Sequence, residues 1–196
     1  MMIPETERKF LYHLIKLLRP TNILEIGTFT GASAIIMATA LGKNTNGKLV
    51  TLDVNPTCMD VARKYVKRLQ LENRVDLRLG LALDSLKELI KEEPKLQFDF
   101  IFIDAYKDQN IGYFDFIMDN KLLSDRGAIV VDDALFHGLV HRLAGYEEMC
   151  HIELEHWDLQ ARCTVEFNRH VQQDPRVQVT VLPIFNGLSL ISNKTD

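Results

Sequence analysis

Residues 22–34 read NILEIGTFTGASA, and this stretch sets the expectation for the whole fold. Residues 22–26 form a short apolar run that ends at a glycine, which is typical of a buried strand. Gly27 and Gly31 allow the backbone to turn sharply and to approach a ligand closely. Residues 32–41 are rich in alanine and end at a glycine, as helices commonly do. The stretch therefore predicts a strand, a tight turn and a helix.

The same alternation of strands and helices continues along the chain. The predicted strands span 22–26, 48–53, 74–79, 98–103, 128–131, 176–182 and 188–192. The predicted helices span 10–18, 32–41, 57–71, 84–92 and 111–120, and 141–170 is polar and mostly helical. This order favours an α/β, Rossmann-like fold with a mostly parallel, doubly wound sheet and helices on both faces. Pro183, Asn186 and Gly187 separate the last two strands and predict an antiparallel C-terminal hairpin.

Composition indicates one globular domain. The chain has 196 residues, of which 46% are hydrophobic and 26% charged, and no repeat or flexible linker interrupts it. We therefore expect a single domain over 1–196, with an N-terminal helix within 1–20 and a core over 21–196. The net charge of −4 argues against a nucleic-acid partner held by phosphate contacts.

Cysteine usage and hydropathy indicate a cytoplasmic protein. The chain has an odd number of cysteines, which are widely spaced and form no CxxC motif: Cys58, Cys150 and Cys163. This usage favours a reducing compartment. No apolar run approaches the roughly 18 residues of a membrane span. Residues 1–10, MMIPETERKF, lack the apolar core of a signal peptide. We expect no membrane span.

The glycine-containing turn and Asp53 predict a site for a nucleoside-containing cofactor. The N-terminus of the helix after the turn, near Ala32 and Ser33, offers unpaired N–H groups to an anionic group. Asp53 ends the next predicted strand, 22 residues after Gly31, where a carboxylate can accept hydrogen bonds from both ribose hydroxyls.

The spacing of the glycines distinguishes among nucleoside cofactors. A dinucleotide site would read GxGxxG, whereas this turn reads GxxxG and has Phe29 where the middle glycine would admit a pyrophosphate. A cofactor with one ribose and no pyrophosphate fits better, and S-adenosylmethionine is the common one. Two alternatives remain open: a tight turn without a ligand, and a nicotinamide-dependent oxidoreductase.

Three aspartates predict a site for a divalent cation. Asp104 follows one apolar strand, and Asp132 and Asp133 follow another. If these strands are neighbours, their ends lie about 5 Å apart. Like charges at that distance are costly unless one is protonated or a cation lies between them. Oxygen ligands favour Mg²⁺, Ca²⁺ or Mn²⁺ over zinc. The alternative is that Asp132 or Asp133 caps the following helix.

Lys107 is a candidate general base because it lies one helical turn after Asp104. A neighbouring divalent cation disfavours the charged form of a lysine, so that its neutral amine can accept a proton. The alternative is a solvated surface lysine.

At these residues the sequence resembles the class I, metal-dependent S-adenosylmethionine O-methyltransferases of the catechol and caffeoyl-CoA type. The matching segments are ILEIGTFTGASA (23–34), LVTLDVNP (49–56), VDLRLGLALDSLKEL (75–89), FDFIFIDAYKDQN (98–110), GAIVVDDALFHG (127–138) and FNRHVQQDPRVQVTVLPIFNGLSL (167–190). They occur in family order over nearly the whole chain.

The resemblance implies roles for individual residues. It assigns the methionine end of the cofactor to Glu25, Gly27, Phe29, Gly31 and Ser33, the ribose to Asp53, and the adenine to Ala82. It assigns a cation to Asp104, Asp132 and Asp133, places Asp104 near the cofactor as well, and makes Lys107 the catalytic base. The family usually has Asn where Asp133 stands, and the extra charge should strengthen cation binding or favour a different ion. Residues 139–165, which shape the acceptor pocket in the family, depart from its pattern.

The implied reaction is methyl transfer to a hydroxyl of a small catechol-like or hydroxycinnamoyl-type aromatic diol, with magnesium as the first choice of cation. A homodimer is also expected from the resemblance. The competing hypothesis is a degenerate relative that binds S-adenosylmethionine and acts as an interaction module. A nucleic-acid methyltransferase is disfavoured, because the chain is mildly acidic and lacks an Asn/Asp-Pro-Pro-aromatic tetrapeptide.

Overall fold

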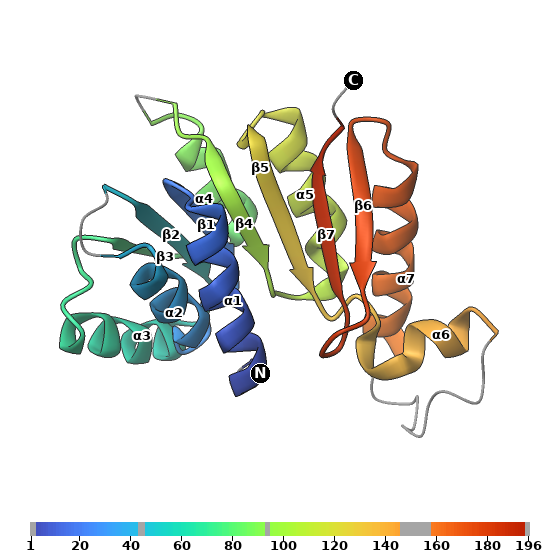
Figure 1. Ribbon diagram of the computed structural model, residues 1–196, viewed down its shortest axis with the longest axis horizontal. Helices are drawn as coiled ribbons and strands as arrows, with labels where there is room; N and C mark the ends of the chain where they lie inside the picture. Colours follow the sequence, from blue (N-terminus) through green and yellow to red (C-terminus); the bar gives the residue numbers. More distant parts are fainter. Residues whose placement is uncertain (1–2, 43–45, 93–94, 146–157, 195–196) are drawn as a thin grey trace.

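The computed structural model describes residues 3–42, 46–92, 95–145 and 158–194. Within them, seven strands form one sheet in the order β3-β2-β1-β4-β5-β7-β6 (Figure 1). The strands are β1 (Asn22–Ile26), β2 (Lys48–Asp53), β3 (Val75–Leu79), β4 (Phe98–Ile103), β5 (Leu123–Asp132), β6 (Val177–Leu182) and β7 (Leu188–Asn193). The first five strands are parallel, and β7 pairs antiparallel with both β5 and β6. The predicted α/β fold and its antiparallel hairpin are confirmed.

Helices cover both faces of the sheet. They are α1 (Glu5–Leu18), α2 (Ala32–Ala40), α3 (Pro56–Arg68), α4 (Ala82–Leu89), α5 (Asn110–Asp119), α6 (Leu139–Leu143) and α7 (Asp158–Gln173), with 3₁₀ turns η1 (Lys107–Gln109) and η2 (Phe136–Gly138). Helices α1, α2 and α3 pack on one face, and α4, α5 and α7 pack on the other (Figure 1). Part of the predicted helical segment 141–170, residues 146–157, lies outside the described residues.

The central strand β4 contributes to both apolar cores. Phe100 and Phe102 face the core beneath α1 and α2, whereas Ile101 and Ile103 face the core beneath α4 and α5. All four side chains are fully buried. A strand that is apolar at every position is expected where helices cover both sides of a parallel sheet.

Two elements begin five residues earlier than the sequence pattern predicted. Helix α1 begins at Glu5 rather than at residue 10, because the polar residues 5–9 concealed its periodicity. Strand β5 begins at Leu123 rather than at residue 128, because exposed Asp125 and Arg126 interrupt the apolar pattern. The first extension matters for function, since it brings the beginning of α1 to the carboxyl ends of the strands.

The described helices contain no segment with the length and apolar character needed to cross a bilayer.

The docking of α1 on the sheet is testable with two leucines of that helix. Leu11 is completely buried, whereas Leu17 is 79% exposed. Leu11→Ala should lower the free energy of unfolding by about 2–5 kcal/mol, because it leaves a cavity in a packed core. Leu17→Ala, the control, should change it by less than about 0.5 kcal/mol. Urea denaturation measures both values, and equal losses would contradict the packing of α1.

Candidate functional site

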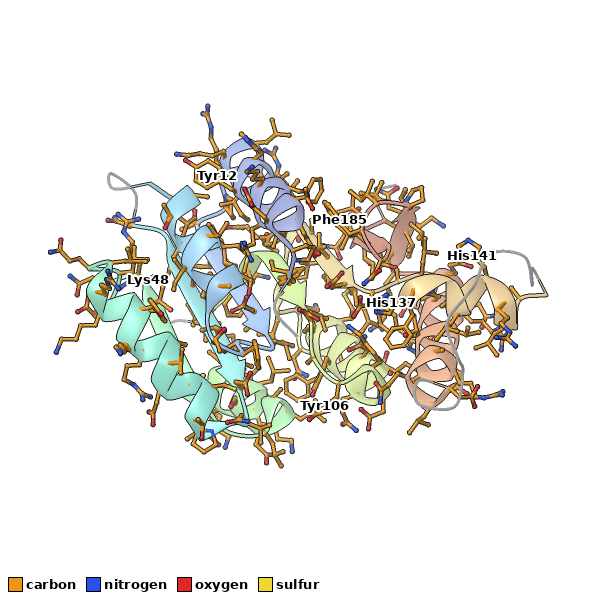
Figure 2. The ribbon with its side chains drawn as sticks, turned by 90° about the horizontal axis from the view of Figure 1, so that it is seen from below. Tyr12, Lys48, Tyr106, His137, His141 and Phe185 are labelled. Carbon is orange, nitrogen blue, oxygen red and sulfur yellow. The ribbon has the colours of Figure 1, made fainter. Side chains whose placement is uncertain are left out.

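A cavity of about 990 Å³ lies beyond the carboxyl ends of β1, β2 and β4. Seven residues singled out in the sequence line it: Gly27, Phe29, Asp53, Ala82, Asp104, Lys107 and Asp133. Parallel strands of this fold class bind ligands at this edge of the sheet. Figure 2 views the molecule from that edge and labels Tyr106 and His137, two further lining residues. The cavity therefore joins the glycine turn and the acidic residues in one site.

The glycine turn between β1 and α2 is held against the neighbouring strand ends. The N–H groups of Gly27 and Thr28 donate to the Leu52 carbonyl at 2.9 and 3.2 Å. Gly27 has a φ of 105°, and a Cβ atom there would lie 2.0 Å from the Asp104 carbonyl oxygen. Only glycine permits this approach. The turn and the end of β4 therefore form one rigid unit.

The Asp53 carboxylate is oriented by two backbone donors. Its Oδ2 accepts a hydrogen bond from the Phe29 N–H at 2.6 Å, and its Oδ1 accepts one from the Asn55 N–H at 2.8 Å. Each carboxylate oxygen can accept a further hydrogen bond. Asp53 lines the cavity, so it can bind a pair of hydroxyl groups there.

Glu25 and Ser33 lie behind the glycine turn, and neither they nor Gly31, the last residue of the turn, are among the residues that line the cavity. Glu25 is fully buried and accepts a hydrogen bond from the Thr51 hydroxyl. Burial raises the pKa of Glu25 to about 8, although hydrogen bonds from Ser33 and Thr51 act in the opposite direction. Glu25 and Ser33 therefore support the backbone of the turn on the side away from the cavity.

Asp104, Asp132 and Asp133 converge at the ends of β4 and β5. One carboxylate oxygen from each lies within 4.8 Å of the others. The parallel register that pairs Ile103 with Val131 places Asp104 beside Asp132. Successive strand residues normally point to opposite faces. Asp133 leaves that pattern with a φ of 63°, a left-handed conformation that aspartate tolerates, and its carboxylate therefore reaches the same point as Asp132.

The capping alternative for these aspartates does not hold. The short helices that follow begin after Leu135 and Gly138, and neither receives a side-chain cap. Asp132 Oδ1 instead accepts the N–H of Asp133 at 2.7 Å, and Asp133 Oδ1 accepts a hydrogen bond from the Asn186 amide at 3.1 Å.

Lys107 is buried among the three aspartates, so it is not a solvated surface lysine. Only 6% of it is exposed. Its Nζ lies 3.0 Å from Asp133 Oδ2 and 3.5 Å from Asp104 Oδ1, and it donates to the Asp132 carbonyl at 3.2 Å. Burial lowers the pKa of Lys107, but the charges of the three aspartates outweigh burial and raise it. Lys107 is therefore charged in this arrangement.

Glu7 is a fourth carboxyl group that sequence reasoning missed. It lies on α1 and is 2% exposed. Burial raises its pKa to about 7, and the charges of Asp104 and Asp133 add to the rise. The available signal was its spacing, since Glu7, Leu11 and Ile15 recur every four residues along the buried side of α1.

The acidic cluster fits a hard divalent cation. Two oxygen ligands of one ion lie at most twice the metal–oxygen distance apart, about 4 Å for Mg²⁺ and about 5 Å for Ca²⁺. The carboxylate oxygens lie within 4.8 Å of one another, which meets the limit for Ca²⁺ and would have to shorten slightly around Mg²⁺. Burial raises the pKa of Asp132 to about 8, with further contributions from the charges of Asp104 and Asp133. Burial also raises the pKa of Asp104. Once Asp132 and Asp104 have lost their protons, the single positive charge of Lys107 leaves negative charge in the cluster that a cation would compensate.

One lining residue comes from 139–165, the region that the resemblance connects with the acceptor, and two come from the turn just before it. Gln160, on α7, lines the cavity, and its Oε1 accepts a hydrogen bond from the Lys107 N–H at 3.3 Å. Phe136 and His137 line it from η2 with φ values of 42° and 56°. Their contribution could not be derived from strand-end positions, because they belong to the connection after β5.

The cation-free protein should lose stability as pH rises from about 5 to about 8. The folded-state pKa values of about 8 for Asp132 and about 7 for Glu7 lie above the ordinary values of 3.8 and 4.5. The folded chain therefore holds more protons than the unfolded chain in this window, and the free energy of unfolding falls with rising pH, on the order of a few kcal/mol.

Urea unfolding at a series of pH values, with a chelator present, measures this dependence. Asp132→Asn should reduce the slope, because the amide does not titrate. Asp60→Asn, at an exposed position of α3, should leave it unchanged. A stability that is flat or rises through this window would contradict the burial of these carboxyl groups.

Comparison with known proteins identifies the family. A family model described as O-methyltransferase matches residues 1–194. The chain is 31% identical over 185 residues to caffeoyl-CoA O-methyltransferase of Medicago sativa, an alignment that covers 94% of this chain and 71% of that protein.

Solved structures agree with this result. The SAH-bound methyltransferase PaMTH1 of Podospora anserina superposes with a TM-score of 0.89 at 30% identity, covering 99% of this chain and 80% of that chain. An O-methyltransferase from Bacillus cereus in complex with SAH superposes with a TM-score of 0.81 at 32% identity, covering 98% of this chain and 83% of that chain. The protein therefore belongs to the class I, S-adenosylmethionine-dependent O-methyltransferases of the caffeoyl-CoA O-methyltransferase family.

Proposed function

We propose that this O-methyltransferase transfers a methyl group to one hydroxyl of a small catechol-like or hydroxycinnamoyl-type aromatic diol, with a divalent cation held by Asp104, Asp132 and Asp133. The observation that carries the proposal is the convergence of these three carboxylates, of which Asp104 and Asp133 line the same cavity as the glycine turn. The similarity to a caffeoyl-CoA O-methyltransferase supports an acceptor of this class.

The cofactor would occupy the part of the cavity between the glycine turn and α4. Asp53 would bind the ribose hydroxyls with the acceptor capacity that its two backbone contacts leave open. Ala82, the first residue of α4, lines the cavity where the resemblance assigns the adenine. Gly27 and Phe29 would surround the methionine end, and Gly31 would complete the turn, with Glu25 and Ser33 behind it.

The acceptor would lie between the cofactor and the acidic residues. A bound divalent cation would chelate both oxygens of a vicinal diol and lower the pKa of the attacking hydroxyl. In the transfer itself, the hydroxyl oxygen forms a bond to the methyl carbon while the carbon–sulfur bond breaks. The electron pair of that bond stays on sulfur, and S-adenosylhomocysteine results. Holding oxygen, carbon and sulfur in line is the main task of the cavity.

Lys107 is proposed to accept the proton of the attacking hydroxyl. Its Nζ lies within 3.5 Å of Asp104 and Asp133, beside the proposed position of the diol. Without a cation, burial lowers the pKa of Lys107, but the charges of the aspartates outweigh burial and raise it. Once those charges are compensated by a cation, burial remains and favours the neutral amine that a base requires.

Removing the acidic ligands tests the cation part of the proposal. Asp104→Ala combined with Asp132→Ala should lower methyl transfer about a hundredfold or more, because the diol loses its orientation and activation. A screen of vicinal-diol aromatics with labelled S-adenosylmethionine, with and without a chelator, measures this. A control combines Asp60→Ala and Asp125→Ala, which change exposed carboxylates only. Activity that survives the double replacement or complete chelation would remove the cation from the mechanism.

Lys107→Ala tests the base assignment. We expect turnover to fall about 10²–10⁴-fold, the usual contribution of a general base, with nearly unchanged affinity for S-adenosylmethionine. Steady-state kinetics at saturating cation and calorimetric cofactor titration separate the two effects. Lys91→Ala, at an exposed lysine after α4, is the control. A defect confined to cofactor binding would contradict the assignment.

A further inference from the structure

Glu7 occupies a position at which packing alone would select an apolar residue. It shares the buried side of α1 with Leu11 and Ile15 and is 2% exposed. Figure 1 shows the beginning of α1 at the edge of the sheet where β4 and β5 end. A carboxyl group that is buried without compensation is costly, so its presence here calls for a polar partner.

The polar surroundings of Glu7 come from the acidic cluster rather than from its own helix. Besides burial, the charges of Asp104 and Asp133 raise the pKa of Glu7, whereas a hydrogen bond with Asp132 and the charge of Lys107 lower it. By contrast, Glu5 is exposed and forms a 2.7 Å ion pair with Lys9. The helix thus directs one of these two glutamates to solvent and the other into the site.

One oxygen of Glu7 has no partner. Among the described residues, no hydrogen-bond donor reaches Glu7 Oε1, although the atom is buried. The nearby Arg8 does not supply one, because its guanidinium donates to the Ile3 carbonyl at 2.8 Å. Lys107 is committed to Asp104, Asp132 and Asp133. A buried acceptor that is left open beside three converging carboxylates indicates a missing donor in that space.

We propose that Glu7 is a positioning residue of the cation centre: it holds Asp132 in place and offers Oε1 as the acceptor for a water molecule or hydroxyl group bound to the cation. The inference rests on the cation part of the proposed function. Hydrogen-bonded residues around metal ligands fix the orientation of those ligands and strengthen binding of the ion. Glu7 belongs to α1, so the ion binds best when α1 is docked on the sheet. Cation binding therefore also stabilises the docked position of α1.

Calorimetric titration with Mg²⁺ alone, and separately with Mn²⁺ alone, tests the proposal without measuring activity. Glu7→Gln keeps the size of the side chain and removes its charge, and should weaken cation binding about 10-fold or more. Glu5→Gln on the exposed side of the same helix is the matched control and should stay within about twofold of the wild type. Glu7→Asp keeps the charge on a shorter side chain and should bind the ions more tightly than Glu7→Gln.

Thermal unfolding separates a positioning role from a packing role. If Glu7 acts on the cation, Glu7→Gln without cation should melt no lower than the wild type, because one of four clustered carboxyl groups is gone. On addition of Mg²⁺, the melting temperature of Glu7→Gln should then rise less than that of the wild type. S-adenosylmethionine affinity should remain within about twofold, since Glu7 does not line the cofactor cavity.

Two results would overturn the inference, and they are distinguishable. If the wild type binds Mg²⁺ or Mn²⁺ and Glu7→Gln binds them equally well, Glu7 is a packing residue and the proposed function stands. If the wild type binds neither ion, the cation part of the proposed function fails together with the role of Glu7. Should Glu7→Gln fail to fold, Glu7→Asp decides the question, because wild-type cation affinity in that variant would contradict a position-dependent role.

Discussion

Repulsion among four clustered carboxyl groups around one lysine, two of them buried and two half-buried, is the constraint on which the rest of the site depends. Besides burial, the charges of Asp104 and Asp133 raise the pKa values of Asp132 and Glu7, and Lys107 supplies one positive charge among these groups. Burial makes each unpaired charge costly. The arrangement is stable when protons or a divalent cation compensate the excess. The cluster could therefore hold a cation, and its own stability is expected to depend on pH.

The sheet creates this constraint through its strand order. Strand β4 lies between β1 and β5, so that its carboxyl end adjoins both the glycine turn and the acidic end of β5. The close contact between Gly27 and the backbone of Asp104 couples the two halves of the site. A shift of the turn would move Asp104, and with it both the cation site and the cofactor cavity. The proposed in-line transfer requires this kind of fixed spacing between donor and acceptor.

Most of the architecture could be predicted because apolar periodicity carries it. The alternating segments predicted the parallel sheet and the closing hairpin, both of which the structure confirms. Strand-end positions also led to Asp53, Asp104, Asp132 and Asp133, which the structure brings to one edge. The starts of α1 and β5 were missed, because their first residues are polar and carry no apolar repeat. Gln160 was missed because it reaches the cavity from α7, far along the chain.

By itself the sequence determined the fold class, the glycine turn and the residues that stand where strands end, since local periodicity and backbone freedom depend only on neighbouring residues. Tertiary structure alone decided that Asp133 turns back with a positive φ, that Lys107 is buried among carboxylates, and that Glu7 joins them from α1. These outcomes depend on which segments pack together. The pKa and hydrogen-bonding needs of a buried group are set by its neighbours in space, not by its neighbours in the chain.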